Sequence, residues 1–293
     1  MKNTWMLVDD PQKRETAQCD IQGARQIGLD TEYDSFRYFR EKLCLIQIST
    51  ASRMYVFDPL LDLDISFLGD VFADPTTVKI LHACDNDIRL LNRDYDFEFT
   101  NIFDTYRAAC TLEAPSLSLK SIIQDHLGVE LEKSKKIQRS RWDVRPLTEE
   151  QLGYAALDTR YLIDLYFSLR EKLRETGLEE VAGELFDKMT DVKWHEKIFK
   201  PKGFFTIEGY DDLEENQKLC LKRLYRWRFD TAKKTNTAPF LILSDRSMIE
   251  LSRAEGLTVE SLSETGILPV SKGETFGAEI LEMIESVQSD MYN

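Results

Sequence analysis

Two acidic residues, Asp30 and Glu32, stand two positions apart at the end of the apolar run Gln26–Asp30. Side chains two positions apart in an extended strand point to the same face, so these carboxylates would lie side by side and repel each other. Divalent cations relieve such repulsion, because Mg²⁺ prefers carboxylate oxygens and water as ligands. The pair indicates a metal site, although an isolated Asp-x-Glu is more often a solvated strand end.

A second acidic segment follows another apolar run, Val78–His82, and contains Asp85 and Asp87. Asp87 is a candidate metal ligand because it would lie just beyond the end of a strand. The alternative interpretation is that it caps a helix, which aspartate does well. Asp85 competes with Asp87 as the functional acid of this segment.

Tyr154 and Asp158 are four positions apart in a segment with helical spacing of apolar residues. Residues four apart lie on one helix face, one turn from each other. The helix should begin at Thr148, because Thr148–Gln151 fits a capping box, in which both side chains bond the other's backbone amide. Taken alone, a tyrosine and an aspartate on one face are usually a surface interaction.

Five short strands would position these residues. They have apolar or alternating patterns and are separated by turn or helical segments. The predicted strands are Gln26–Asp30, Leu43–Ser49, Met54–Pro59, Val78–His82 and Asn101–Phe103. Helical patterning dominates from Thr105 to Gly177 and returns after Asp211. We predict an α/β domain over residues 1–186, a linker over 187–210 and a small all-α domain over 211–293.

The composition limits the class of protein. The chain has 293 residues, a hydrophobic fraction of 42% and a formal net charge of −14. This charge excludes a protein that coats nucleic acid by bulk electrostatics, but allows an enzyme that binds one strand end at a metal site. We find no apolar run near the roughly 18 residues of a membrane helix and no apolar stretch typical of a signal peptide. We therefore expect a cytoplasmic protein without membrane attachment, in which the five scattered cysteines are free thiols.

The order of these motifs is more specific than any one of them. The flanking segments also fit one family: Leu29–Tyr33, Leu43–Ile48, Leu81–Ala83, Phe103–Thr105 and Arg145–Thr148. Residues 20–186 resemble the DEDDy branch of the DEDD 3′→5′ exonuclease superfamily, and within it ribonuclease D. This resemblance implies an RNase H-like mixed sheet of five strands flanked by helices. The spacing of the family's second motif selects Asp87 over Asp85.

The resemblance also implies a mechanism with two divalent metal ions, Mg²⁺ or Mn²⁺, about 4 Å apart. Asp30 would bridge both ions, Glu32 and Asp158 would complete the shell of the first, and Asp87 would hold the second. Tyr154 would orient the attacking water, because a phenol positions water more readily than it acts as a base. The products would be nucleoside 5′-monophosphates.

Further residues are candidates for contacting the nucleic-acid strand. Six basic residues fall within thirteen positions, Lys133–Arg145, and this segment precedes the helix of Tyr154. They would follow a phosphate backbone, and nearby aromatic rings would stack on bases. The alternatives are that the basic segment is a solvated loop, that the aromatic rings pack in a core, and that His82 has a structural role. The candidate substrate-binding residues are Thr31, Tyr38, Phe39, His82, Lys135, Lys136, Arg139 and Trp142.

Residues 210–290 resemble an HRDC domain, a helical module. The resemblance rests on Trp227-Arg228, Pro239 and the segment Ile242–Asp245, where Ser244 or Asp245 would cap a helix. Residues 211–293 contain fifteen acidic and ten basic side chains, so nucleic-acid binding would have to use a local basic face of the helix around Trp227. For this domain, the sequence leaves two roles open, which are nucleic-acid binding and packing against other parts of the protein.

The resulting functional hypothesis is a 3′→5′ exoribonuclease that acts on RNA with a free 3′ end, with tRNA precursors as the expected substrates. One alternative is a DNA-directed 3′→5′ exonuclease. Another is an inactive DEDD scaffold that binds nucleic acid, which the presence of all five chemical residues disfavours.

Overall fold

The computed structural model describes residues 5–132 and 134–289, and the chain forms two compact units. The first unit comprises Met1–Asp34 and Lys42–His195, and the second comprises Ser35–Glu41 and Glu196–Asn293. Each unit has a hydrophobic core of its own.

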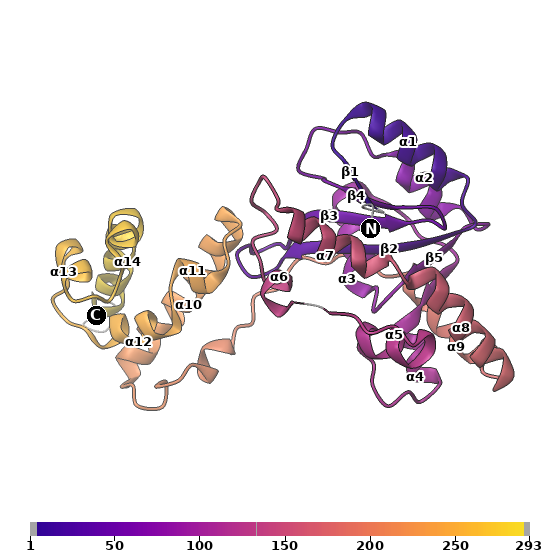
Figure 1. The fold of residues 1–293 in the computed structure, drawn as a ribbon. Helices are drawn as coiled ribbons and strands as arrows, with labels where there is room; N and C mark the ends of the chain where they lie inside the picture. Colours follow the sequence, from indigo (N-terminus) through magenta and orange to yellow (C-terminus); the bar gives the residue numbers. More distant parts are fainter. Residues whose placement is uncertain (1–4, 133, 290–293) are drawn as a thin grey trace. The chain divides into compact units, whose positions relative to one another are not determined.

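The first unit is built on a mixed sheet with the strand order β1-β4-β3-β2-β5-β6 (Figure 1). The strands are β1 (Trp5–Val8), β2 (Gln26–Asp34), β3 (Lys42–Ser49), β4 (Met54–Phe57), β5 (Val78–Leu81) and β6 (Ile102–Asp104). Strand β3 pairs antiparallel with β2 and β4, and the other neighbours are parallel. The mixed α/β class is confirmed. The sheet has six strands in the described residues, one more than the five predicted. The additional strand is β1.

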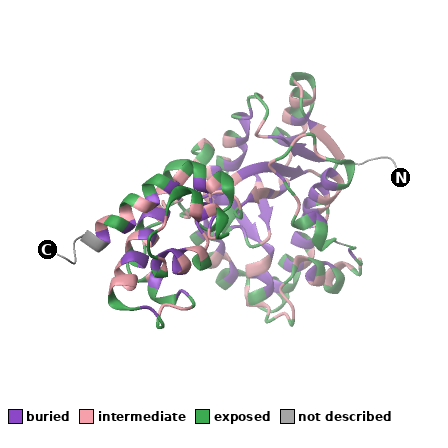
Figure 2. Cartoon of the chain, turned by 90° about the vertical axis from the view of Figure 1, so that its left-hand side faces the viewer, coloured by how far each residue is buried: buried purple, intermediate pink, exposed green. Residues whose placement is uncertain are grey.

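Helices cover both faces of this sheet, so most of β3 is buried on both sides (Figure 2). The helices are α1 (Pro11–Gln22), α2 (Phe67–Ala73), α3 (Asp85–Tyr95), α4 (Thr105–Thr111), α5 (Leu119–Leu127), α6 (Lys135–Gln138), α7 (Glu149–Thr159), α8 (Leu162–Glu175) and α9 (Glu179–Thr190). Helices α1, α2 and α3 pack on one face. Helix α7 packs on the other face, across β2, β3 and β4, where Leu152, Ala155 and Ala156 meet Leu45 and Val56.

A glycine lets α7 approach the sheet closely. Gly28 on β2 pairs with Ser49 on β3, and a Cβ atom at Gly28 would collide with the Ser49 hydroxyl and lie 3.0 Å from the Thr159 carbonyl oxygen. The Ser49 hydroxyl donates a hydrogen bond of 2.8 Å to this same carbonyl. The carboxyl end of α7 is therefore fixed on β3 and on β2, the strand that carries the first acidic pair.

The second unit is all α, as predicted. It contains the 3₁₀ helix η1 (Gly203–Thr206) and the helices α10 (Glu215–Thr235), α11 (Pro239–Ile242), α12 (Asp245–Arg253), α13 (Val259–Glu264) and α14 (Val270–Ser289). Ser244 caps α12 by accepting a hydrogen bond of 2.9 Å from the Ser247 amide, one of the two predicted caps. Phe204 and Ile207 join the core of this unit, although both fall in the predicted linker 187–210.

The segment Ser35–Glu41 belongs to the second unit, inside the range 1–186 that was predicted as one domain. Phe39 is 1% exposed, and its ring centroid lies 5.3 Å from that of Phe229. The Phe39 amide donates to the Asn236 carbonyl (3.3 Å), and the Ala238 amide donates to the Arg37 carbonyl (2.9 Å). Backbone and ring contacts thus build this segment into the helical unit.

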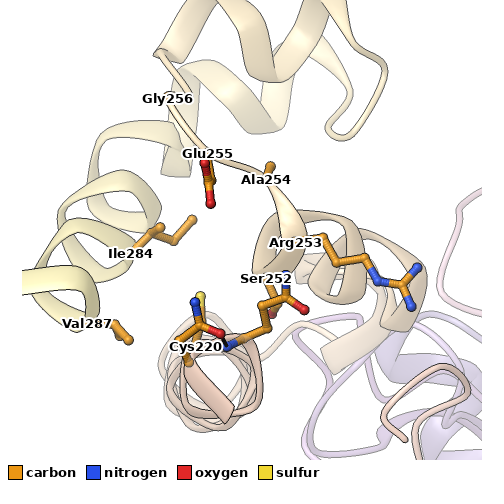
Figure 3. Close-up of a pocket in the computed structure, with 10 residues that line it drawn as sticks. Cys220, Ser252, Arg253, Ala254, Glu255, Gly256, Ile284 and Val287 are labelled. Atoms are coloured by element: carbon orange, nitrogen blue, oxygen red, sulfur yellow. Dashed lines mark hydrogen bonds between the residues drawn. The ribbon is translucent and has the colours of Figure 1, made fainter. Parts of the chain in front are cut away.

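The second unit also has a pocket of about 370 Å³ between α10, α12 and α14, lined by residues that include Cys220, Ser252, Arg253, Ile284 and Val287 (Figure 3). It contains none of the residues predicted for catalysis or strand binding. Among the described residues, no helix has the length and apolar character needed to cross a membrane.

Candidate active site

The first group of site residues lies on β2 and α7. Asp30 and Glu32 are partly buried on β2, and both pair with residues of β3 that lie under α7. Helix α7 begins where predicted, because the Thr148 and Gln151 side chains each bond the other's backbone amide. Asp158 is buried in the last turn, next to the carbonyl of Thr159 that the strands hold.

Tyr154 is close to three of the predicted carboxylates. Burial raises the pKa of its phenol, and the negative charges of Asp158, Glu32 and Asp30 raise this pKa further. The phenol therefore keeps its proton and is suited to donate a hydrogen bond rather than to accept a proton. The structure brings these four side chains together at one place between β2 and α7.

Trp142 supports Tyr154 and is not available to stack on a base. It is 3% exposed and packs with Ile137, Leu152 and other residues between α7 and the sheet. Its ring centroid lies 6.1 Å from that of Tyr154, and its Nε1 donates to the Gln138 carbonyl at 3.3 Å. The prediction of Trp142 as a stacking surface is wrong, because the indole fills the core beside the phenol.

Asp87 lies buried in the first turn of α3, and Thr31 binds it directly. The Thr31 hydroxyl donates a hydrogen bond of 2.5 Å to Asp87 Oδ1. Burial is the main cause that raises the pKa of Asp87, and the charge of Asp104 raises it further, while the bond from Thr31 lowers it. Thr31 stands between Asp30 and Glu32 and is itself buried. Its hydroxyl is used to hold Asp87, and its contact with the substrate stays a prediction.

The competing acid, Asp85, has a different environment. Its exposed carboxylate forms an ion pair with Arg107, with an N–O distance of 2.9 Å. Arg107 also pairs with Asp104 at 2.8 Å, and Asp104 caps α4 by accepting from the Arg107 amide. The structure therefore explains Asp85 by a surface ion pair and places Asp87 next to the strand of the first acidic pair.

The donor set of this site fits a hard divalent cation. Asp30, Glu32, Asp87 and Asp158 offer only carboxylate oxygens, the ligands that Mg²⁺ and Mn²⁺ prefer. As the side chains lie, no three His, Cys, Asp or Glu side chains within residues 5–132 and 134–289 form a ready ligand group. The roles of these four carboxylates as ligands stay a prediction.

The predicted strand-binding residues have mixed outcomes. Lys135, Lys136 and Arg139 are exposed on and after α6. Two other basic residues of this segment are in ion pairs, with 2.7 Å between nitrogen and oxygen: Arg141 with Asp143 and Arg145 with Asp58. Lys133 lies outside the described residues.

Three remaining candidates lie elsewhere. His82 Nδ1 lies 2.9 Å from the Thr105 hydroxyl, which fits the structural alternative for this strand end. Tyr38 belongs to the segment that is built into the second unit. Phe39 fills the core of that unit, so its prediction as a base-stacking ring is wrong.

Gln47 is a residue of this site to which the sequence analysis assigned no role. It is fully buried on β3 and pairs directly with Asp30 across the antiparallel ladder. The signal that could have identified it is a carboxamide within the otherwise apolar run Leu43–Ile48.

Comparisons with known proteins identify the family of the chain. The sequence model of a family described as 3′-5′ exonuclease matches residues 6–174, and that of the HRDC domain matches residues 217–284. The chain is 31% identical to the exosome complex component 10 homolog of Drosophila melanogaster, over 85% of this chain and 28% of that protein. The chain thus spans less than a third of the length of that relative.

Two solved structures have a similar fold. The catalytic core of RRP6 from Trypanosoma brucei superposes with a TM-score of 0.89 at 21% identity, covering 99% of this chain and 81% of that one. RNase D of Escherichia coli, described as an exoribonuclease involved in structured RNA processing, gives a TM-score of 0.70 at 24% identity, covering 97% and 75%. The family match covers more than half of the chain and includes β2, α3 and α7. The chain therefore belongs to the 3′-5′ exonuclease family and carries an HRDC domain after its exonuclease domain.

Proposed function

We propose that this chain is a metal-dependent 3′→5′ exoribonuclease of the ribonuclease D and RRP6 type. The observation that carries the proposal is the convergence of Asp30, Glu32 and Asp158 on the partly buried phenol of Tyr154. Family membership supports a 3′→5′ direction, and the relatives named as an exosome component and as an exoribonuclease support RNA as the substrate.

In the proposed reaction, different residues of the chain bind the metal ions, orient the attacking water and hold a metal ligand in place. Asp30, Glu32, Asp158 and Asp87 would hold two divalent ions, Mg²⁺ or Mn²⁺, which when bound activate a water and stabilise the leaving oxygen. Tyr154 would donate a hydrogen bond that orients the attacking water. Thr31 holds the Asp87 carboxyl in place.

The proposed substrate is RNA with a free 3′ hydroxyl, and tRNA precursors are one class that such an enzyme would trim. The two alternatives, a DNA exonuclease and an inactive scaffold, are less well supported. Relatives of the chain are named for RNA processing, and the residues for chemistry are all present.

One assay tests the proposed function. RNA and DNA oligonucleotides of the same sequence, labelled at the 5′ end and carrying a 3′ hydroxyl, are incubated with the protein in Mg²⁺, Mn²⁺ or EDTA. We expect RNA to shorten one nucleotide at a time, with release of 5′-monophosphates, only with a metal. Faster shortening of DNA than of RNA would support the DNA alternative, because an RNA enzyme uses the 2′-hydroxyl to tell the two apart. No shortening of either strand would support the scaffold.

The exposed cations of α6 are expected to hold the phosphate backbone. We predict that replacing Lys135, Lys136 and Arg139 together by glutamine raises the KM for single-stranded RNA about tenfold at low salt. Each lost phosphate contact should also reduce the slope of log KM against log salt by about 0.7. Steady-state rates between 25 and 300 mM KCl measure both effects.

A matched control removes the same charge elsewhere. Arg170, Lys172 and Arg174 on α8 are each in an ion pair with a nearby glutamate, and replacing them by glutamine also removes three positive charges. This control should leave the salt slope unchanged. Equal salt slopes for the α6 variant and the unmodified protein would contradict a role for α6 in RNA binding.

A further inference from the structure

Gln47 has a buried side chain without hydrogen bonds. It is 0% exposed, and among the described residues neither its Nε2 nor its Oε1 has a hydrogen-bond partner. Most buried polar side-chain atoms in proteins are paired, and an unpaired one at a specific position calls for an explanation. The core cluster between β3, β4 and α7 consists of apolar side chains, so packing in that core alone does not explain a carboxamide on β3.

The register of the sheet places this carboxamide beside the candidate metal site. Gln47 on β3 is directly opposite Asp30 on β2. Directly opposed residues of an antiparallel pair point to the same face, with Cβ atoms about 5 Å apart. The preceding pair on this face is Gly28 with Ser49, which contacts the carboxyl end of α7, and the following pair is Glu32 with Leu45. Gln47 therefore lies within the layer formed by α7 and the two acidic residues of β2.

The chemistry of the carboxamide matches this location. The Nε2 of Gln47, directly across the ladder from Asp30, can donate a hydrogen bond to one carboxylate oxygen of Asp30. This bond would fix the direction in which the second carboxylate oxygen points. Residues that hydrogen-bond a metal ligand in this way orient it, and their loss costs typically 10- to 100-fold in metal affinity or activity. The Oε1 acceptor is then free to accept from a water at the site.

We propose that Gln47 is a positioning residue that orients the Asp30 carboxylate for a divalent cation. The proposal rests on the proposed function, in which Asp30 is a metal ligand. It has an unusual consequence for stability: the carboxamide makes no hydrogen bond within the folded chain, so its removal at constant volume should not destabilise the protein without metal.

The test uses Gln47→Met, which keeps the length of the side chain and removes both polar atoms. We expect Mn²⁺ alone to bind 10- to 100-fold more weakly by titration calorimetry, and the melting temperature in EDTA to stay the same or rise. With RNA, kcat at fixed Mn²⁺ should fall while the KM for RNA stays the same. The matched control is Leu45→Met on the same strand and face, which should bind Mn²⁺ like the unmodified protein.

The outcomes are separable. If the unmodified protein binds Mn²⁺ and degrades RNA, but Gln47→Met binds Mn²⁺ with the same affinity, this inference is overturned and the proposed function stands. A melting temperature in EDTA lowered by several degrees in both Gln47→Met and a second variant, Gln47→Leu, also overturns it, because the carboxamide would then be structural. If the unmodified protein neither binds Mn²⁺ nor shortens RNA, the proposed function fails, and this inference fails with it.

Discussion

Replacing Asp30 by asparagine is expected to reduce the hydrolysis of RNA with a 3′ hydroxyl by at least about 10³-fold, which corresponds to about 4 kcal/mol of activation free energy. Asparagine has nearly the same shape but carries no charge. It would therefore weaken the binding of the ions that activate the water and stabilise the leaving oxygen. The measurement is the single-turnover rate on a 5′-labelled RNA in saturating Mn²⁺.

The folded state should tolerate this change. Asp30 shares its site with Glu32 and Asp158, so loss of one negative charge relieves repulsion and should leave the melting temperature in EDTA unchanged or higher. Asp125→Asn, on the exposed side of α5, is the control for an aspartate of the same unit and should keep full activity. Near-normal turnover by a well-folded Asp30→Asn protein would rule out the site as assigned.

Asp87→Asn and Asp85→Asn are expected to differ strongly, although they lie two positions apart. We predict a loss of about 100-fold in kcat for Asp87→Asn, or about 3 kcal/mol, and a change of less than threefold for Asp85→Asn. Asp87 is buried and held by Thr31 next to the first acidic pair, whereas Asp85 is exposed and paired with Arg107. Rates measured on the same RNA compare the two directly.

Stability measurements complete this comparison. The exposed ion pair between Asp85 and Arg107 should contribute at most about 1 kcal/mol to the free energy of unfolding, so Asp85→Asn should change it little. A large loss of activity for Asp85→Asn together with normal activity for Asp87→Asn would reverse the assignment of the second motif.

Local signals in the sequence explain why several elements were predicted well. The capping box at Thr148 needs only residues within one turn, so the beginning of α7 followed from the sequence alone. The same applies to Ser244 at α12, where a side chain bonds an amide three positions later. The spacing of Tyr154 and Asp158 on one helix was equally local.

Features that depend on packing between distant segments were not predictable in this way. Trp142 and Phe39 were expected to face the substrate, because an aromatic ring beside catalytic motifs has the same local pattern whether it is buried or exposed. Their burial depends on α7 and on Phe229. Strand β1, only four residues long, exists through parallel pairing with β4, some 50 positions later. Thr31 is a further case, since its partner Asp87 lies 56 positions away.

The segment Ser35–Glu41 has a consequence for how the protein forms during translation. It directly follows β2, yet Arg40 finds its partner Asn236 196 positions later in the chain. When Phe36 and Phe39 leave the ribosome, the rings of Phe240 and Phe229 that they contact have not yet been made. The aromatic segment that follows the strand of Asp30 and Glu32 therefore stays without these ring partners while much of the remaining chain is made, and exposed rings of this kind on a nascent chain favour chaperone binding over this interval.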